Sequence, residues 1–501
     1  MTQQNVNTQF ELVGNISANA LLSALNTFTT AKKQRKQIVH QSYYDSFDGR
    51  LAENGLSADY CVSSDNAVFS LRQLTGETVI ASAALTELPI FAHQFESAAL
   101  RTRLEPVLEN RALLKLCTMS IERHCIDILD KRQKIIVRLE FEQCAAFNNR
   151  VSVIALKGYV EQAHNVVAQL KRLQMIKNVV STRINSLPAA YNAKIRCEFT
   201  ADTSAEHACR DLLKQLFQLL KANQPGVIAH LDNEFLHDYR VAVRRTRVLL
   251  SQMKTVEPDY AYQHFSEFFT WLGAVTSPTR DLDVYVEQFT QYQSCLPAAL
   301  SADLLPFRDV LLNKQASAQQ ALAEHLNSAK YLDTLTAWDA FLHSSQALPI
   351  QPATLSIKTL ADKKIRRLFK RVLQQGRAIT DASSPECLHD LRKTCKKLRY
   401  LLEFFQSLYP TKVIKAFVQP LKDMQEMLGR HQDFCVQEQQ LGEFSEELRV
   451  LNTPSATLIA LQALITVLDK NRQQTRDEFS QCFSQFSGHS TLSLFNRLFT
   501  H

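Results

Sequence analysis

The residues best suited to bind a ligand are cations in a helical segment that occurs twice. The first copy, residues 237–250, reads H-D-Y-R-V-A-V-R-R-T-R-V-L-L, and the second, residues 389–402, reads H-D-L-R-K-T-C-K-K-L-R-Y-L-L. The register is ungapped, with an offset of 152 residues. A repeated cationic helix surface predicts a polyanionic partner. The candidate binding residues are His237, Arg240, Arg244, Arg245 and Arg247, with His389, Arg392, Lys396, Lys397 and Arg399.

Helical geometry separates these cations from an apolar stripe. Positions spaced 3, 4 and 3 residues apart share one face of a helix, and the His and three cations of each copy have that spacing. We expect the apolar stripe to pack into a bundle while the basic stripe stays available. The alternative is a solvated basic face on two bundle helices. The apolar stripe comprises Tyr239, Val243, Leu250 and Met253, matched by Leu391, Cys395, Leu402 and Phe405.

A third basic element precedes the second copy. Seven cations fall within 15 residues that contain no acid, and their counterparts at 211–219 are mostly uncharged. We expect this segment to extend the basic surface of the second copy, although a solubilising helix face is the alternative. Its candidate binding residues are Lys363, Arg366, Arg367 and Lys370, and its other cations are Lys364, Arg371 and Arg377.

The repeat continues beyond the basic helices. Asp281 and Asp433 match at the same offset of 152, within T-S-P-T-R-D-L-D-V and L-G-R-H-Q-D-F-C-V. We expect each Asp to lie in a turn, where it caps a helix start or holds a neighbouring Arg.

Composition excludes several classes of protein. The chain has 501 residues, of which only 11 are Gly, and we find no G-x-x-x-x-G-K or G-x-G-x-x-G nucleotide loop. The 11 Cys form no C-x-x-C pair, so no zinc ribbon or redox motif is indicated and no metal or cofactor is expected. The N-terminus lacks a signal-peptide pattern and no apolar run approaches a bilayer span. We therefore expect a cytoplasmic protein without a membrane partner.

Periodicity predicts a multidomain chain. Residues 1–185 mix strands at 67–74, 134–142 and 151–156 with helices at 16–29, 97–109 and 160–176, which indicates an α+β domain ending near 185–188. Residues 195–501 read as an all-α domain of antiparallel bundles, with halves of about 195–345 and 346–501. Its expected helices are 205–221, 234–254, 262–273, 302–326, 355–379, 385–408 and 455–486.

The repeated His-Asp helices, with R-D-L-D-V after the first, resemble the CHAD family (conserved histidine α-helical domain) over about residues 195–501. This resemblance implies two helical bundles related by pseudo-twofold symmetry, with a basic groove between them. It also implies binding of inorganic polyphosphate, often at polyphosphate granules in bacteria, where granule proteins would be further partners. By motif, the binding residues are the ten His, Arg and Lys of the two copies. The 363–371 run lies where the family also tends to be basic.

The N-terminal domain resembles a degenerate CYTH domain, the triphosphate tunnel family, which implies an antiparallel sheet or half-barrel. Residues 43–56, Y-Y-D-S-F-D-G-R-L-A-E-N-G-L, carry this resemblance. The family opens with E-x-E-x-K, whose carboxylates hold a divalent metal, and the equivalents here are Glu11, Val13 and Asn15. Metal-assisted phosphoanhydride cleavage needs several oxygen ligands. We therefore expect no hydrolase activity from this domain.

Three functions stay open on the sequence. The first is non-enzymatic binding of polyphosphate through a basic groove. The second is a CYTH-type triphosphatase with the CHAD domain as a substrate-binding accessory, against which the missing carboxylates argue. The third is a nucleic-acid-binding protein, which is disfavoured because no aromatic stacking platform accompanies the basic helices. His237 and His389 could each donate to phosphate or hold a structural hydrogen bond, and both readings stay open.

Overall fold

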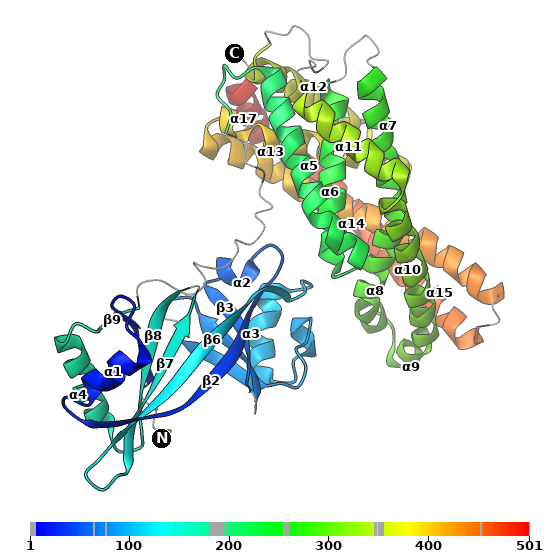
Figure 1. Ribbon diagram of the computed structural model, residues 1–501. Coiled ribbons are helices and arrows are strands. Elements are labelled where there is room, and N and C mark those ends of the chain that lie inside the picture. The colour runs from blue at the N-terminus through cyan, green and yellow to red at the C-terminus, as the bar shows by residue number, and fades with distance from the viewer. Residues whose placement is uncertain are drawn as a thin grey trace. The chain divides into compact units, whose positions relative to one another are not determined.

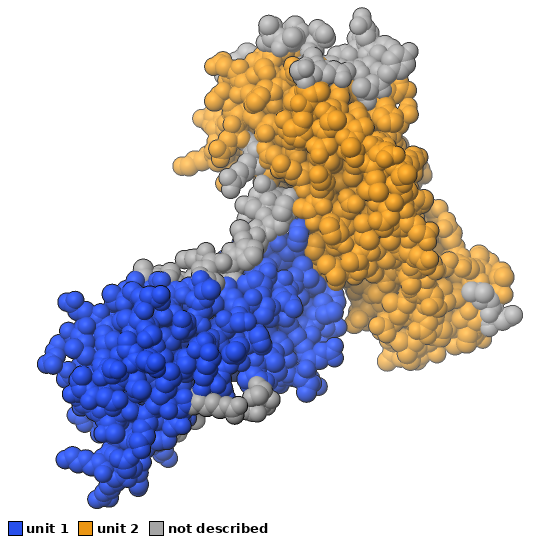
Figure 2. Space-filling model, in the orientation of Figure 1, with its two compact units in different colours: residues 1–193 blue, residues 194–501 orange. Residues whose placement is uncertain are grey.

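The computed structural model describes residues 7–63, 66–75, 78–145, 147–179, 195, 198–253, 260–344, 348, 355–450 and 453–499 (Figure 1). The chain divides into two compact units, 1–193 and 194–501, coloured separately in Figure 2. The boundary expected at 185–188 lies outside the described residues.

The N-terminal unit is built on a nine-stranded sheet in the order β5-β4-β3-β2-β6-β7-β8-β1-β9, and all its strand pairs are antiparallel. This confirms the predicted α+β class with an antiparallel sheet. The strands are β1 (Asn7–Leu12), β2 (Thr30–Asp45), β3 (Leu56–Val62), β4 (Ala67–Gln73), β5 (Val79–Ala84), β6 (Leu114–Leu129), β7 (Ile135–Cys144), β8 (Phe147–Ala155) and β9 (Ile176–Asn178).

Helices cover the apolar face of this sheet. Helices α1 (Ala18–Leu25) and α4 (Val160–Arg172) bury Leu21 and Leu170 against strand residues such as Phe141. Helix α3 (Ala98–Leu108) belongs to a second core, near the short helices α2 (Arg50–Glu53) and η1 (Ala92–Gln94). Burial of these apolar side chains is the main stabilising term of the unit.

Some predicted elements of this unit are shorter than expected. The helix expected over 160–176 ends at Arg172, because Gln174 adopts a left-handed φ of 51° and the chain then enters β9. The helix expected over 16–29 is only Ala18–Leu25, and its N-cap Ser17 accepts a hydrogen bond from the Ala20 N–H. The expected strands 67–74, 134–142 and 151–156 overlap β4, β7 and β8.

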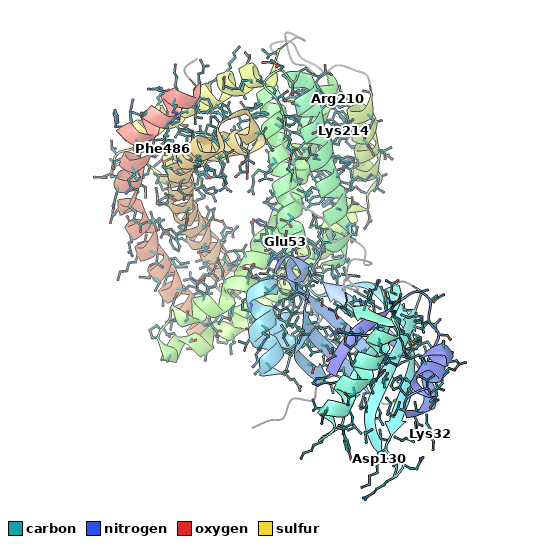
Figure 3. All side chains as sticks on the ribbon, turned by 90° about the vertical axis from the view of Figure 1, so that its left-hand side faces the viewer. Lys32, Glu53, Asp130, Arg210, Lys214 and Phe486 are labelled. Atoms are coloured by element: carbon teal, nitrogen blue, oxygen red, sulfur yellow. The ribbon has the colours of Figure 1, made fainter. Side chains whose placement is uncertain are left out.

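Apart from one isolated β-bridge, the described secondary structure of the second unit is helical, which confirms the all-α prediction (Figure 1). Arg210 on α5 ties that helix to α11 by donating to the carbonyls of Phe341 and Leu342 (Figure 3). The helices are α5 (Ala205–Ala229), α6 (Asn233–Met253), α7 (Tyr260–Val275), α8 (Ser277–Ser294), α9 (Ala298–Ser301), η3 (Ala302–Leu304), α10 (Leu305–Leu326), α11 (Ala329–His343), α12 (Ile357–Ala378), α13 (Pro385–Phe404), η4 (Gln406–Leu408), α14 (Thr411–Val450), α15 (Ser455–Asp477), α16 (Phe479–Phe486) and α17 (His489–Phe499).

The two halves of the helical unit meet at equivalent positions. Ser204 caps α5 and Ser356 caps α12, and these two residues form an antiparallel bridge. Ala205 N donates to Leu355 O and Ile357 N donates to Thr203 O, and each N–O distance is 2.8 Å. Since the bridged residues are 152 positions apart, each half makes the same contact with the other. Such reciprocity is the signature of a twofold relation.

The expected Asp-bearing turns are wrong. Asp281 lies in the second turn of α8, and Asp433 lies in the interior of the 40-residue α14. The sequence around Asp433 contains Gly429, but a single Gly inside a helix costs only about 1 kcal/mol relative to Ala. Both acids therefore project from a helix, and any role in holding Arg comes from that position.

Candidate functional site

The two repeated segments form α6 and α13, whose apolar stripes are buried as predicted. Tyr239, Val243 and Leu250 on α6 are at most 2% exposed, and the α13 counterparts are likewise buried. The Met253 side chain lies outside the described residues. Because the apolar stripes are fixed in the core, the basic stripes have defined orientations.

Helices α6 and α13 contact each other through a polar bridge. Arg245 Nη2 donates to Glu403 Oε2 over 2.9 Å, and Arg399 Nε donates to the other oxygen of Glu403 over 2.6 Å. The guanidinium groups of Arg244 and Arg245 lie 5.9 and 5.6 Å from the centre of the Tyr400 ring. The repeated helices are thus side by side, and one carboxylate and one aromatic ring hold part of their charge.

A cluster of cations lies along the same contact. Burial, followed by the nearby Arg392 and Arg244, lowers the pKa of Lys396 to about 7. Burial also lowers the pKa of Arg392. The carboxylate of Asp433, which lies 3.6 Å from Arg392 Nη2, opposes this shift. The Nε atoms of Arg244 and Arg392 are buried without a hydrogen-bond partner. Buried donors without acceptors are costly, so an oxyanion here would relieve both repulsion and unmet hydrogen bonding.

Arg240 and Arg247 are bound more closely to the protein. Arg240 Nη1 donates to Gly273 O, Thr276 Oγ1 and Ser277 Oγ at 2.8–3.2 Å. Arg247 Nη1 lies close to Gly273, because a Cβ added to Gly273 would be 3.0 Å from that nitrogen. Its counterpart Arg399 also donates to Gln425 Oε1 over 3.3 Å. These three guanidinium groups brace the helices that carry the cluster.

The two motif histidines are half-buried in protein contacts. His389 Nδ1 donates to Gln432 Oε1 over 2.7 Å. Burial lowers the pKa of His237. The charge of Glu234 opposes this shift, and the charge of Arg280 adds to it. Gln432 and Arg280 are repeat counterparts, so each histidine faces the same position in its own half. Neither histidine lines the pockets described next.

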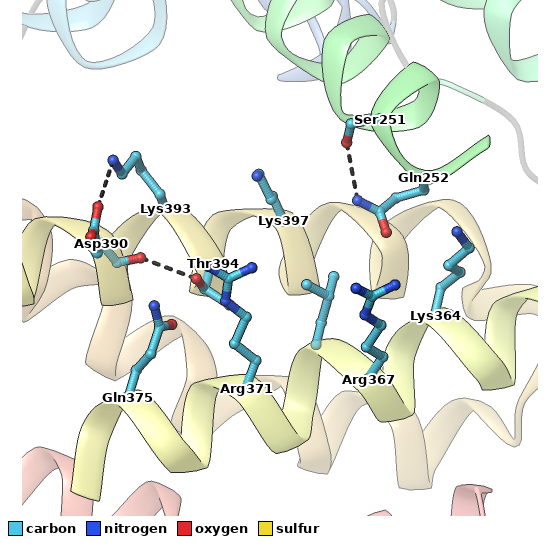
Figure 4. A pocket seen from close by; sticks show the side chains of 11 residues that line it. Ser251, Gln252, Lys364, Arg367, Arg371, Gln375, Asp390, Lys393, Thr394 and Lys397 are labelled. Atoms are coloured by element: carbon cyan, nitrogen blue, oxygen red, sulfur yellow. Dashed lines mark hydrogen bonds and ion pairs between the residues drawn. The ribbon is translucent and has the colours of Figure 1, made fainter. Parts of the chain in front are cut away.

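A pocket of about 500 Å³ opens between α12, α13 and the end of α6, and we call it the basic pocket (Figure 4). The one carboxylate among its described lining residues, Asp390, is paired with Lys393 at a distance of 2.6 Å. Five cations from two helices point toward this hollow, so the described lining residues carry a net charge of +4. The lining residues are Ser251, Gln252, Lys364, Arg367, Leu368, Arg371, Gln375, Asp390, Lys393, Thr394 and Lys397.

The cations of the basic pocket repel one another. Burial lowers the pKa of Lys397, and the positive charges of Arg371, Lys393 and Arg247 lower it further. Burial lowers the pKa of Lys364, and the positive charges of Arg367 and Lys363 lower it further. In both cases the charges that contribute most to the shift, after burial, are of the same sign, which disfavours the protonated amine. A bound anion would reverse this effect.

A second hollow of about 510 Å³ lies on the other side of α12, and we call it the outer pocket. Its carboxylate, Asp362, already accepts from Lys358 Nζ at 2.6 Å and from the Tyr409 hydroxyl at 2.7 Å. Its lining residues are Thr359, Asp362, Lys363, Arg366, Arg367 and Lys370. The four candidate residues of the third basic element therefore all line this pocket, and Arg367 lines both.

The candidate residues do not form one uniform surface. The structure brings Lys397 and Arg367 into the basic pocket, places Arg392, Lys396 and Arg399 along the α6–α13 contact, and turns His389 toward Gln432 of α14. Three pocket cations were not among the candidates, namely Lys364, Arg371 and Lys393. The spacing 364–367–371 puts the first two on one helix face, a signal available in the sequence. Lys393 gave no signal because its counterpart in the first copy is Val241.

The basic pocket has no chemical counterpart in the first half. At the offset of 152, its α12 cations correspond to uncharged side chains on α5. Lys214, the counterpart of Arg366, lies one turn from Arg210 on α5 (Figure 3). The counterparts of Lys364, Arg367, Arg371 and Lys393 are Leu212, Gln215, Leu219 and Val241.

The N-terminal sheet carries a row of alternating charges opposite its apolar face. Glu11 on β1 lies in register between Lys177 on β9 and Arg150 on β8. Its carboxylate is 3.4 Å from Lys177 Nζ and 3.9 Å from Arg150 Nη2. The next strands continue the row with Glu142 and Arg123, joined over 2.7 Å. Within the described part of the chain, no group of three or more His, Cys, Asp or Glu could hold a metal ion.

The helices of the described residues include none that is long and apolar enough to cross a membrane.

The family comparison matches residues 211–442 to the CHAD domain. No curated protein matches the chain. Among solved structures, the CHAD domain from the plant Ricinus communis is 26% identical, with a TM-score of 0.46, and the match covers 56% of this chain and 93% of that one. PptA from Streptomyces chartreusis is 14% identical, with a TM-score of 0.45, and covers 56% of this chain and 100% of its own.

Other solved structures match a smaller part of the chain. A putative adenylate cyclase from Bacillus halodurans is 14% identical, with a TM-score of 0.28, and covers 36% of this chain and 95% of its own. A putative adenylyl cyclase from Hippeastrum, described as having a dominant triphosphatase activity, is 14% identical, with a TM-score of 0.27, and covers 36% and 94%.

Proposed function

The chain contains a CHAD domain at residues 211–442, and on this premise we propose that its helical unit binds inorganic polyphosphate without turning it over. The observation that carries the proposal is the basic pocket, in which five cations face one carboxylate that is already paired. A further cluster around Lys396 lies on the neighbouring contact of α13 with α6.

Polyphosphate suits this lining better than most anions. It offers closely spaced oxyanions and no base edges, so recognition depends on charge and on oxygen geometry. Arg367 and Arg371 can each bridge two oxygens with a planar fork, while Lys364, Lys393 and Lys397 act as mobile point charges. Repulsion among these groups is relieved when the anion enters, and this favours binding.

Nucleic acid is a weaker candidate for the same site. Single-stranded nucleic acids are usually held by aromatic side chains on which bases stack. No aromatic residue is among the described residues that line the basic pocket, and Tyr400, the ring beside Arg244 and Arg245, is only 7% exposed. A phosphate backbone could still be attracted by charge, so DNA serves as a competitor in the test.

Hydrolysis by the N-terminal unit is also disfavoured. Glu11 is the one carboxylate retained at the position of the expected metal motif, and Lys177 and Arg150 flank it. A carboxylate engaged by two cations is a poor ligand for a divalent metal. The proposal therefore assigns ligand binding to the helical unit, and attachment to polyphosphate granules would be its consequence in a cell.

The test is direct binding of long-chain polyphosphate to the full chain, measured by titration with a labelled polymer. Tripolyphosphate and duplex DNA are added as competitors at equal phosphate concentration. The proposal predicts displacement by unlabelled polyphosphate at concentrations well below those needed for DNA. Equal displacement by DNA, or no binding of the polymer, would contradict it.

A further inference from the structure

Helix α12 is cationic around a broad arc. At 100° per residue, its six pocket cations follow one another around the helix at intervals of about 20–40° and span about 160°. The opposite side is buried, with Ile365, Phe369 and Val372 at most 1% exposed. In order around the axis, the cations are Arg366, Lys370, Lys363, Arg367, Arg371 and Lys364.

The basic pocket and the outer pocket lie on the two ends of this arc. Arg367 lines both pockets and is exposed between them. Each pocket follows about 16 Å of α12, from Lys364 to Gln375 in one case and from Thr359 to Lys370 in the other. Among the described residues, Asp390 and Asp362 are the carboxylates that line these pockets, and both are paired.

We propose that one polyphosphate chain occupies both pockets, crossing α12 at Arg367, so that the site selects for chain length. The inference rests on the proposed function and specifies its ligand as a polymer long enough to pass over the helix. A short oligophosphate fills only one pocket. A long chain gains the contacts of Lys363 and Lys370 in addition, without a second loss of translational freedom.

The lining of the outer pocket supports this division. Lys363 and Lys370 are exposed, whereas Lys358 and Arg366 are engaged with Asp362. Of the four cations that line the outer pocket, Arg366 is engaged with Asp362 and Arg367 is shared with the basic pocket, so Lys363 and Lys370 are the charges that the outer pocket adds. Its charge becomes effective when the basic pocket already holds the chain.

The test compares long-chain polyphosphate with tripolyphosphate on the full chain carrying Lys363→Gln and Lys370→Gln. We expect the Kd for the long chain to rise roughly tenfold and its salt slope to fall by about 2, one for each phosphate contact removed. The Kd for tripolyphosphate should stay within about twofold of wild type, because the basic pocket is intact.

A matched control removes the same charge elsewhere. Lys412 and Lys415 are exposed on the first turns of α14 and line neither pocket. Lys412→Gln with Lys415→Gln should leave both affinities nearly unchanged. An unaffected long-chain Kd in the Lys363/Lys370 variant, or an equal loss for tripolyphosphate, would overturn the inference. Failure of wild type to bind either ligand would instead overturn the proposed function.

Discussion

Arg245 of α6 donates a hydrogen bond to Glu403 of α13 over 2.9 Å, whereas its repeat counterpart Lys397 lines the basic pocket. The charged groups that shift the pKa of Lys397 are all cations. Two positions that are equivalent in the sequence therefore lie in different electrostatic surroundings. One cation links the two halves, and the other is left for a ligand.

This difference predicts unequal effects of matched substitutions. Lys397→Gln should weaken polyphosphate binding roughly tenfold at moderate salt, because a ligand contact is lost. Arg245→Gln should change the Kd by less than about threefold but lower the free energy of unfolding by about 1 kcal/mol, because an ion pair is lost. Binding titrations and denaturant unfolding of both variants separate the roles. A larger binding defect in the Arg245 variant would reverse the assignment.

Asp390 is the carboxylate of the basic pocket, and it holds Lys393 at 2.6 Å. Asp390→Asn should strengthen binding about threefold, because the pocket loses its negative charge and Lys393 becomes available. The gain should fade as salt is raised, since it is electrostatic. Lys393→Gln is the companion variant and should weaken binding. Weaker binding by the Asn variant would place the ligand elsewhere.

The lowered pKa of Lys396 predicts that polyphosphate binding depends on pH. Its pKa of about 7 means that it loses its charge as pH rises through neutrality, so affinity should fall between about pH 6 and pH 8. Binding of a polyanion raises that pKa, and protons should be taken up on association. Calorimetry in two buffers with different ionisation enthalpies measures this uptake.

Lys396→Arg is the control for that pH dependence, because a guanidinium stays charged throughout this range. The variant should bind with a flatter pH profile and less proton uptake. A variant with both His237 and His389 changed to Gln tests the share of the histidines. If the Arg variant keeps the full wild-type pH profile while the double His variant loses it, Lys396 is not the titrating group.

Glu11 predicts the behaviour of the N-terminal unit. We expect no phosphate release from tripolyphosphate with Mg²⁺ or Mn²⁺, because the carboxylate is held by Lys177 and Arg150. Glu11→Gln should instead destabilise the unit by about 2 kcal/mol, because it removes one of the two carboxylates that flank the buried Arg150 in register. Metal-dependent release that disappears in the Gln variant would revive the triphosphatase hypothesis.

The repeat was the part of the structure most accessible from sequence. Apolar spacing identified α6 and α13, and the apolar stripes predicted for them are buried. The same offset of 152 relates Ser204 to Ser356, whose bridge marks the symmetry between the halves. Local patterns succeed here because a helix buries one stripe and exposes another, and both stripes leave a periodic signal.

Long-range features left weaker signals. The sequence does not predict the 16-residue strands β2 and β6, because their side chains are mostly polar or only partly buried and do not alternate strictly. The sequence predicts a turn near Asp433, inside α14, because Gly429 and a polar run interrupt the apolar period there. The basic pocket depends on how α12 packs beside α13, and Lys393 has no charged counterpart in the repeat.

The central claim is that the basic pocket binds polyphosphate through its cations. The most direct test measures the Kd of long-chain polyphosphate from about 50 to 200 mM salt for wild type and for Arg367→Gln, Arg371→Gln, Lys393→Gln and Lys397→Gln combined. We predict steep salt dependence for wild type, and for the variant an affinity at least about 100-fold lower with a slope reduced by about 4. Wild-type affinity and slope in a folded variant would contradict the claim.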